Sequence, residues 1–223
     1  MTSILFFRLN KGKQVVIVGD TQHTHESSTK EESKIDLFND LLFCGSGYDR
    51  IIWDINKKVN NFRSLTRCAN KILALKNEKI REYQQAQTYG VSPDEVQNCD
   101  FMIINTKNLK ANKILLREVN SINQIGMIGS GSSKIGEIQE MLGSAYGFPF
   151  GPHMFKKIIG LFNFLGRHDP LTGHPAIFPL EVFLLEKNKE SKRFIIKFKP
   201  KLEENDNYEI KQESAWTTKR QIL

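Results

Sequence analysis

The chain has 223 residues, of which 39% are hydrophobic and 26% are charged, and its formal net charge is +7. This composition excludes a disordered chain and leaves room for one large domain or two small ones. Its apolar runs are much shorter than the ~20 residues that span a bilayer, and Arg8 interrupts the first run too early for a signal peptide. We therefore expect a cytoplasmic protein without a membrane partner.

Three cysteines, Cys44, Cys68 and Cys99, lie far apart in the sequence. An odd number at this spacing favours reduced thiols over a disulfide framework or a zinc site, and we expect neither a metal nor a cofactor. Lysine and arginine are scattered among acidic residues throughout the chain, and no basic stripe with interleaved aromatic residues stands out. This pattern favours a solvated surface over a nucleic-acid interface.

The first part of the chain predicts two β-hairpins. Apolar, β-branched runs at residues 4–7 and 15–18 flank a polar turn that contains a glycine, which is typical of a hairpin. The polar stretch 21–33 predicts a loop. Strands at 34–38 and 41–44 are expected to form the second hairpin.

Two short motifs near these hairpins allow more than one interpretation. His23 and His25 lie in the predicted loop without a third ligand at strand or helix spacing, which favours loop histidines over a metal site. The sequence Gly45-Ser46-Gly47 ends the second hairpin. It is either an ordinary turn into a helix or a place where backbone amides approach a substrate.

The spacing of apolar residues predicts four helices after the second hairpin. The helices are expected at 48–59, 62–83, 135–142 and 155–165, with Ser132 or Ser133 as the N-cap of the third and Gly151-Pro152 leading into the fourth. Further strands are expected at 100–104, 113–119, 178–185 and 193–198.

This order of elements fits two stacked sheets that are covered by helices on both outer faces. We therefore predict an α+β fold, a four-layer α-β-β-α sandwich, in one domain over residues 1–199. The charged and weakly periodic stretch 200–223 predicts a tail that is disordered or lies on a neighbouring subunit.

Thr2 follows the first methionine directly. Removal of Met1 is expected because the threonine side chain is small, and it would leave a hydroxyl and a free α-amine on one residue. An α-amine has a pKa of about 7.7–8.0, so it can act as the general base for its own hydroxyl. Most chains that begin Met-Thr perform no chemistry there, and the argument needs the rest of the chain.

Short motifs at the ends of the predicted elements occur in a definite order. They are Thr2-Ser3, Val18-Gly19-Asp20, Lys34, Ser46-Gly47, Gly129-Ser130-Gly131-Ser132 and the segment 167–173, Arg-His-Asp-Pro-Leu-Thr-Gly. In this order the sequence resembles the proteasome β-subunit and HslV family of N-terminal nucleophile hydrolases, from Thr2 to about Leu185. Two departures stand out, since Thr172 takes the place of a serine and His168 is inserted between Arg167 and Asp169.

The resemblance implies a role for each motif. Thr2 is the nucleophile, Lys34 lowers the pKa of its amine and stabilises the alkoxide, and Asp20 keeps Lys34 charged and oriented. The Gly47 amide stabilises the tetrahedral oxyanion. The residues expected to orient the amine and its water are Ser130, Asp169 and Thr172.

Position in the matched turns also suggests a substrate pocket beside Thr2. In this pocket Gly45 leaves space, and the carboxylates of Glu32 and Asp49 favour a basic substrate side chain. The residues expected to border it are His23, Glu32, Gly45, Asp49 and Trp53.

The leading hypothesis is a threonine endopeptidase subunit that acts on polypeptides within a ring-shaped homo-oligomer fed by an unfolding ATPase. One alternative keeps the acyl-threonine step but transfers the acyl group to an amine, as a transpeptidase does, or hydrolyses small amides. Another is a non-catalytic assembly subunit with the same fold. Retention of the complete motif set argues against the last.

Overall fold

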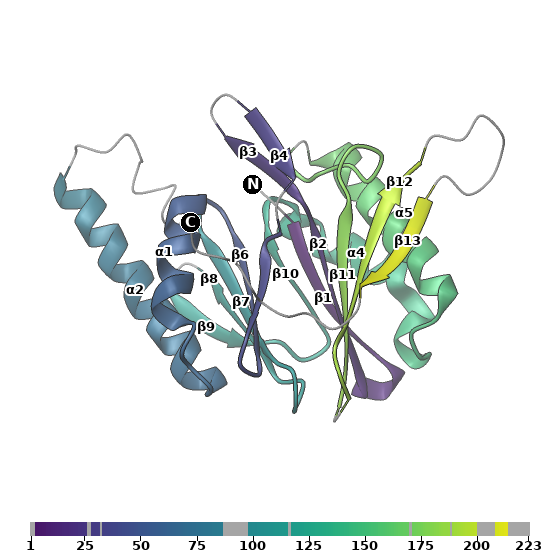
Figure 1. The fold of residues 1–223 in the computed structure, drawn as a ribbon, viewed down its shortest axis with the longest axis horizontal. Coiled ribbons are helices and arrows are strands. Elements are labelled where there is room, and N and C mark those ends of the chain that lie inside the picture. Colours follow the sequence, from purple (N-terminus) through teal and green to yellow (C-terminus); the bar gives the residue numbers. More distant parts are fainter. Residues whose placement is uncertain are drawn as a thin grey trace.

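The computed structural model describes residues 3–25, 28–31, 33–86, 98–115, 117–169, 171–187, 189–199 and 208–213, without the side chains of 22–25, 28–31 and 83–86. Two antiparallel sheets face each other, with one pair of helices outside each sheet (Figure 1). The four-layer α-β-β-α sandwich predicted from the sequence is confirmed.

The first sheet has six strands in the order β10-β1-β2-β11-β12-β13. Their bounds are β1 Ser3–Leu9, β2 Gln14–Asp20, β10 Ile125–Gly129, β11 Leu180–Glu186, β12 Lys192–Phe198 and β13 Tyr208–Glu213. The β1–β2 pair is the first predicted hairpin, with Ile4 opposite Gly19 and Leu9 opposite Gln14. Its turn is the 3-10 helix η1, Asn10–Gly12.

The second sheet has five strands in the order β5-β6-β7-β8-β9. Their bounds are β5 Ile35–Phe38, β6 Leu41–Ser46, β7 Asp100–Asn105, β8 Ala111–Leu115 and β9 Glu118–Ser121. The second predicted hairpin is confirmed as β5–β6. The predicted strand 113–119 is wrong as a single strand, because the chain turns between β8 and β9, which pair with each other.

Four α-helices cover the described sandwich. The pair α1 (Asp49–Val59) and α2 (Leu65–Ala86) lies outside the five-stranded sheet, and α4 (Ile135–Leu142) and α5 (Pro152–His168) lie outside the six-stranded sheet (Figure 1). Short 3-10 helices precede and follow α4, at η2 (Ser130–Lys134) and η3 (Gly143–Gly147). The expected N-cap at Ser132 or Ser133 is wrong, because both belong to η2 and no side chain caps α4.

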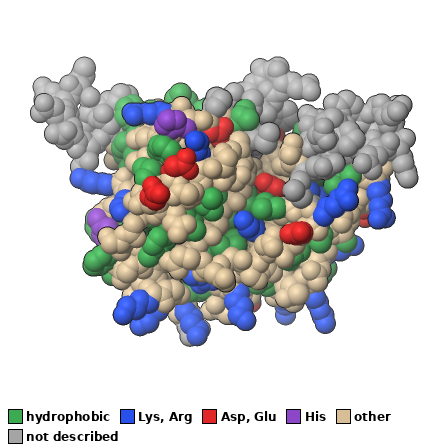
Figure 2. All heavy atoms as spheres, turned by 180° about the vertical axis from the view of Figure 1, so that it is seen from behind, with side chains coloured by type: hydrophobic (Ala, Val, Ile, Leu, Met, Phe, Trp, Pro, Cys, Tyr) green, Lys and Arg blue, Asp and Glu red, His purple; other side chains and the backbone are tan. Residues whose placement is uncertain are grey.

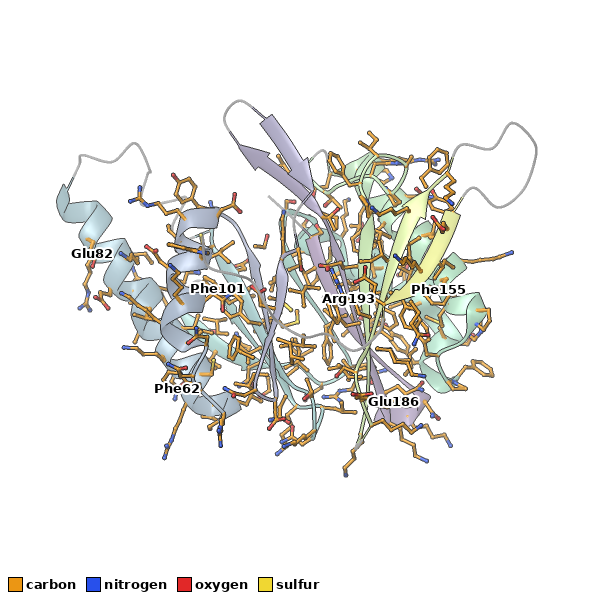
Figure 3. All side chains as sticks on the ribbon, in the orientation of Figure 1. Phe62, Glu82, Phe101, Phe155, Glu186 and Arg193 are labelled. Atoms are coloured by element: carbon orange, nitrogen blue, oxygen red, sulfur yellow. The ribbon has the colours of Figure 1, made fainter. Side chains whose placement is uncertain are left out.

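Strand alternation builds three apolar layers. Along β1, Leu5 and Phe7 pack toward α4 and α5, whereas Ile4 and Phe6 pack between the two sheets. A third cluster, which includes Phe101, lies between the five-stranded sheet and α1 and α2. Figure 3 shows Phe101 on the side of α1 and α2 and Phe155 on the side of α5.

Polar strands were the hardest to predict. The stretch 21–33, predicted as a loop, contains the strand pair β3 (Gln22–His25) and β4 (Ser28–Glu31), so the loop prediction is wrong there. Within the charged stretch 200–223, β13 pairs with β12, with Arg193 opposite Glu213. Six residues of this stretch therefore extend the sheet, while 200–207 and 214–223 lie outside the described residues.

Many of the exposed basic side chains lie at one end of the molecule. The turns between β1 and β2, β7 and β8, β11 and β12, and α1 and α2 all lie at the lower end in Figure 1. Lys and Arg side chains project from that end in Figure 2. Exposed ones in or beside these turns are Lys11, Lys13, Lys57, Lys58, Arg63, Lys107, Lys110, Lys187, Lys189 and Lys192. No helix in the described part of the chain is long and apolar enough to cross a bilayer.

Candidate active site

The first described residue, Ser3, is joined to the end of β2. Its backbone N–H donates a hydrogen bond of 2.9 Å to Oδ2 of Asp20. The register of β1 and β2 explains the contact, because Ile4 pairs with Gly19 and Ser3 therefore lies beside Asp20. Asp20 is only 1% exposed. An ionised carboxylate in such a place is stabilised by the backbone donor.

The side chain of Ser3 is fully buried and is held by two other elements. Its Oγ accepts a 2.9 Å hydrogen bond from the Gly131 N–H in η2, and it lies 2.6 Å from Oγ1 of Thr172. Gly131 has no room for a side chain, since a Cβ there would lie 2.5 Å from Ser3 Oγ. The glycine therefore allows η2 to approach the start of β1.

Asp169 and Thr172 form the next part of the same hydrogen-bond chain. Asp169 follows the last residue of α5, and its Oδ2 accepts a 2.6 Å hydrogen bond from Thr172 Oγ1. Because the Thr172 proton is donated to Asp169, the Ser3 hydroxyl donates to Thr172. The chain thus runs in one direction, from the Gly131 amide through Ser3 and Thr172 to Asp169.

Ser130 lies beside this chain with a hydroxyl that is not engaged. It follows Gly129, which pairs with Ser3 across β10 and β1 and has a φ of +94°. Among the described residues, the buried Ser130 Oγ has no hydrogen-bond partner. A buried hydroxyl without a partner costs about 1–3 kcal/mol, and such groups often mark a functional position.

Lys34 and Gly47 lie at the same end of the facing sheet. The Lys34 carbonyl accepts a 3.3 Å hydrogen bond from the Gly45 N–H, which places Lys34 beside the strand that leads into Gly47. Gly47 has a φ of +128°, and a Cβ there would lie 2.7 Å from Cys99 Cα. Only glycine fits this turn without strain.

A buried ion pair supports the residue before Lys34. Ser33 Oγ donates a 2.7 Å hydrogen bond to Oε2 of Glu181 and accepts one from the Ile35 N–H. Glu181 is 2% exposed and is paired with Arg193, which also pairs with Glu213 of β13. Burial raises the pKa of Glu181, and the Arg193 guanidinium opposes that shift. Figure 3 shows Arg193 on β12, and it packs over Phe183, a residue of the layer between the sheets.

The residues predicted to border the substrate pocket are described only in part. The space beside Gly45 is filled, because a Cβ there would lie 2.4 Å from Ile52 of α1. Asp49 begins α1, and Trp53 is 50% exposed with Lys57 Nζ lying 3.4 Å from its ring centroid. Glu32 and the side chain of His23 lie outside the described residues.

The predicted nucleophile, Thr2, also lies outside the described residues. The predicted residues that the hydrogen bonds bring together with Ser3 are Asp20, Asp169 and Thr172. His168, the inserted residue, lies in the last turn of α5, with its ring 4.5 Å from that of Phe164. No group of three potential metal ligands occurs among the described residues.

Comparisons with known proteins agree with this architecture. No family model and no curated protein matches the chain. Among solved structures, Anbu (ancestral beta-subunit) from Yersinia bercovieri superimposes with a TM-score of 0.63 at 13% identity, over 86% of each chain. An Anbu mutant from Hyphomicrobium sp. strain MC1 gives 0.59 at 15%, also over 86% of each chain. BPH of Thiobacillus denitrificans, in complex with epoxomicin, gives 0.56 at 13%, over 84% of this chain and 100% of that one.

The chain has the proteasome-type N-terminal nucleophile hydrolase fold. Within this fold, sequence reasoning missed Ser3 as a site residue. A serine directly after Thr2 was visible, but its contacts come from Gly131 and Thr172, which are far away in the sequence. Only the pairing of β1 with β10, and the return of the chain after α5, bring those partners to it.

Proposed function

We propose that this chain is a proteasome-like threonine peptidase subunit that hydrolyses peptide bonds through an acyl-Thr2 intermediate after removal of Met1. The observation that carries the proposal is the directed hydrogen-bond chain from Gly131 through Ser3 and Thr172 to Asp169. Ser3 directly follows Thr2 in the sequence, so this chain fixes the residue to which the proposed nucleophile is joined.

Ser3 is unsuited to be the nucleophile itself. Its side chain is fully buried, and its oxygen is occupied by the Gly131 amide and by Thr172. An oxygen in this state has no access to a substrate carbonyl. We assign to Ser3 the role of fixing the start of β1, and to Thr2 the roles of nucleophile and base.

In the proposed mechanism, the α-amine of Thr2 takes the hydroxyl proton through a water, and Oγ attacks the peptide carbonyl. The ammonium of Lys34 lowers the pKa of the amine and stabilises the alkoxide, and Asp20 supports the charge of Lys34. The Gly47 amide stabilises the oxyanion. The unengaged hydroxyl of Ser130 supports a role in orienting the amine or its water. Water then releases the acyl group.

We further propose that the subunit acts on polypeptides inside a ring-shaped homo-oligomer that receives them from an ATPase unfoldase. The support is the architecture shared with a protein described as an ancestral beta-subunit. Analytical ultracentrifugation of the purified protein tests the ring, for which we expect one large closed oligomer. A monomer at micromolar concentration would contradict this part of the proposal.

The experiment that tests the chemistry is intact-mass measurement before and after incubation with a peptide epoxyketone. This probe requires a hydroxyl and a free amine on the same residue. We expect a chain without Met1 that gains one adduct, mapped to Thr2 by peptide sequencing. A chain that keeps Met1 and takes no adduct would overturn the proposal.

Two variants make the result specific. Thr2→Ala removes the hydroxyl and should abolish the adduct, whereas Ser3→Ala keeps the nucleophile and should form the adduct at Thr2 more slowly. Peptide hydrolysis with and without an added amine separates hydrolysis from acyl transfer, because transfer gives a product with a new amide bond.

A further inference from the structure

A buried lysine lies in α2, one of the two helices outside the five-stranded sheet. Lys76 belongs to α2 and is 0% exposed, and its Nζ has no hydrogen-bond partner among the described residues. Burying an ammonium without a partner costs several kcal/mol, and burial lowers the pKa of Lys76. The residues around it in α2 are ordinary core residues, Ile72 and Leu75. The lysine is therefore not explained by packing.

The electrostatic neighbours of Lys76 are Cys99, which directly precedes β7, and Asp100, the first residue of β7. The charges of Asp100 and Cys99 raise the pKa of Lys76 against the effect of burial, and Lys76 in turn lowers the pKa of both groups. Cys99 is fully buried. Asp100 pairs with Ser46 in the register of β6 and β7, so both neighbours lie beside the Gly47 turn.

Cys99 holds that turn directly. Its Sγ accepts a 3.2 Å hydrogen bond from the Tyr48 N–H, the amide that follows Gly47. The Gly47 backbone is in close contact with it, since a Cβ at Gly47 would lie 2.8 Å from Cys99 Sγ. A thiol is a weak acceptor, so the close packing of the Gly47 backbone against Cys99 adds to the hold on the turn.

Asp100 lies close to the second turn of the proposed site. A hydrogen bond from the Gly129 backbone lowers the pKa of Asp100 against the effect of burial. Gly129 pairs with Ser3 and directly precedes Ser130. Cys99 and Asp100, at the entry to β7, therefore lie beside one turn of the five-stranded sheet and one turn of the six-stranded sheet.

We infer that Lys76, Cys99 and Asp100 form a positioning cluster, in which Cys99 fixes the Gly47 turn through the Tyr48 amide, Asp100 lies at the Gly129–Ser130 turn, and the buried ammonium of Lys76 stabilises the Asp100 carboxylate electrostatically. None of the three touches the reacting atoms. The inference rests on the proposed function, because it assigns the cluster to the turns that would bind the oxyanion and orient the amine.

The test compares two buried cysteines in the assembled protein. Cys99→Ala removes the acceptor of the Tyr48 amide, and Cys68→Ala is the matched control, because Cys68 is equally buried in the same cluster of α2 and the five-stranded sheet. Hydrogen exchange of the peptide that contains Tyr48 reports positioning, and kcat and KM for a peptide substrate report its effect. We expect at least tenfold faster exchange at Tyr48 and about a tenfold lower kcat in Cys99→Ala only, with KM within twofold.

Lys76→Met tests the cation separately, with Lys79→Met in the same helix as its control. We expect Lys76→Met to lower kcat by a similar factor without raising KM, and Cys99→Ser, which keeps an acceptor, to lie closer to the wild type than Cys99→Ala. These two variants also decide the matter if Cys99→Ala does not fold.

Equal exchange and equal kcat in Cys99→Ala and Cys68→Ala would overturn the inference. Failure of the proposed function has a different signature. In that case the wild-type protein itself takes no epoxyketone adduct and hydrolyses no peptide, whereas the exchange comparison still shows whether Cys99 holds the turn.

Discussion

The hydroxyl oxygens of Ser3 and Thr172 lie 2.6 Å apart although 169 residues separate them in the sequence. This contact joins the start of β1 to the segment that follows α5. Both side chains are buried, so water cannot readily replace either partner. The position of the chain next to Thr2 therefore depends on one hydroxyl group contributed from the distant end of the fold.

Thr172→Val should weaken both folding and activity. Valine has nearly the same shape but leaves the buried Ser3 hydroxyl and the Asp169 carboxylate without their partner, which typically costs about 1–3 kcal/mol. Urea unfolding measures the loss, and we expect kcat to fall with it. Thr172→Ser keeps the hydroxyl and should lie near the wild type. Equal stability of the two variants would contradict the hydrogen-bond chain.

Much of this fold was predictable from the sequence. Alternating and helically spaced apolar residues predicted both long hairpins and the two pairs of helices, because each element buries one face against another. The strands β3, β4 and β13 were missed since their residues are mainly polar. Nothing in their hydrophobic pattern distinguishes them from loops, and pairing with a neighbouring strand decides their structure.

The candidate site was predictable only in part. The motifs around Asp20, Asp169 and Thr172 were found by resemblance, and the structure joins all three to Ser3. The space expected at Gly45 is filled by Ile52, a packing contact that depends on how α1 lies on the sheet. Contacts of this kind are set by the tertiary structure rather than by any local pattern.

Gly131→Ala should be far more harmful than Gly136→Ala, although the two positions are close in sequence. A Cβ at Gly131 would lie 2.5 Å from Ser3 Oγ and 2.8 Å from Met127 Cε, whereas nothing lies within 4 Å of a Cβ at Gly136. We expect Gly131→Ala to lose roughly 1–3 kcal/mol by overpacking and to slow epoxyketone labelling. Gly136→Ala lies within α4 and should gain up to about 1 kcal/mol. Thermal unfolding distinguishes them, and similar melting temperatures would refute the close approach of η2 to β1.

Arg193→Met should strongly destabilise the protein. It leaves Glu181, which is 2% exposed, without its cation, and breaking a buried ion pair from one side costs about 3–5 kcal/mol. The double variant Arg193→Met/Glu181→Gln removes both charges and should recover most of that loss. Lys199→Met breaks the exposed pair with Glu209 and should change stability by less than about 1 kcal/mol. Urea unfolding of the four proteins makes the comparison, which fails if the double variant is no more stable than Arg193→Met.

Lys76→Met should lower activity without lowering stability at neutral pH. Burial lowers the pKa of Lys76 below its ordinary value of 10.5, so the folded state disfavours the ammonium that the unfolded chain carries. Methionine has a similar length and no charge to bury. The variant should therefore be at least as stable as the wild type at pH 7.

The free energies of unfolding of the wild type and Lys76→Met should become more similar as the pH rises. Between the lowered pKa of folded Lys76 and 10.5, the unfolded wild type binds more protons than the folded one, and its stability relative to Lys76→Met increases with pH. Below that window the difference is constant. Cys99, whose pKa is raised to about 11, and the other titrating groups are present in both proteins, so their contributions largely cancel. Urea unfolding from pH 7 to pH 10 measures the difference, and a stability advantage of Lys76→Met that grows with pH would show that the buried ammonium is not disfavoured.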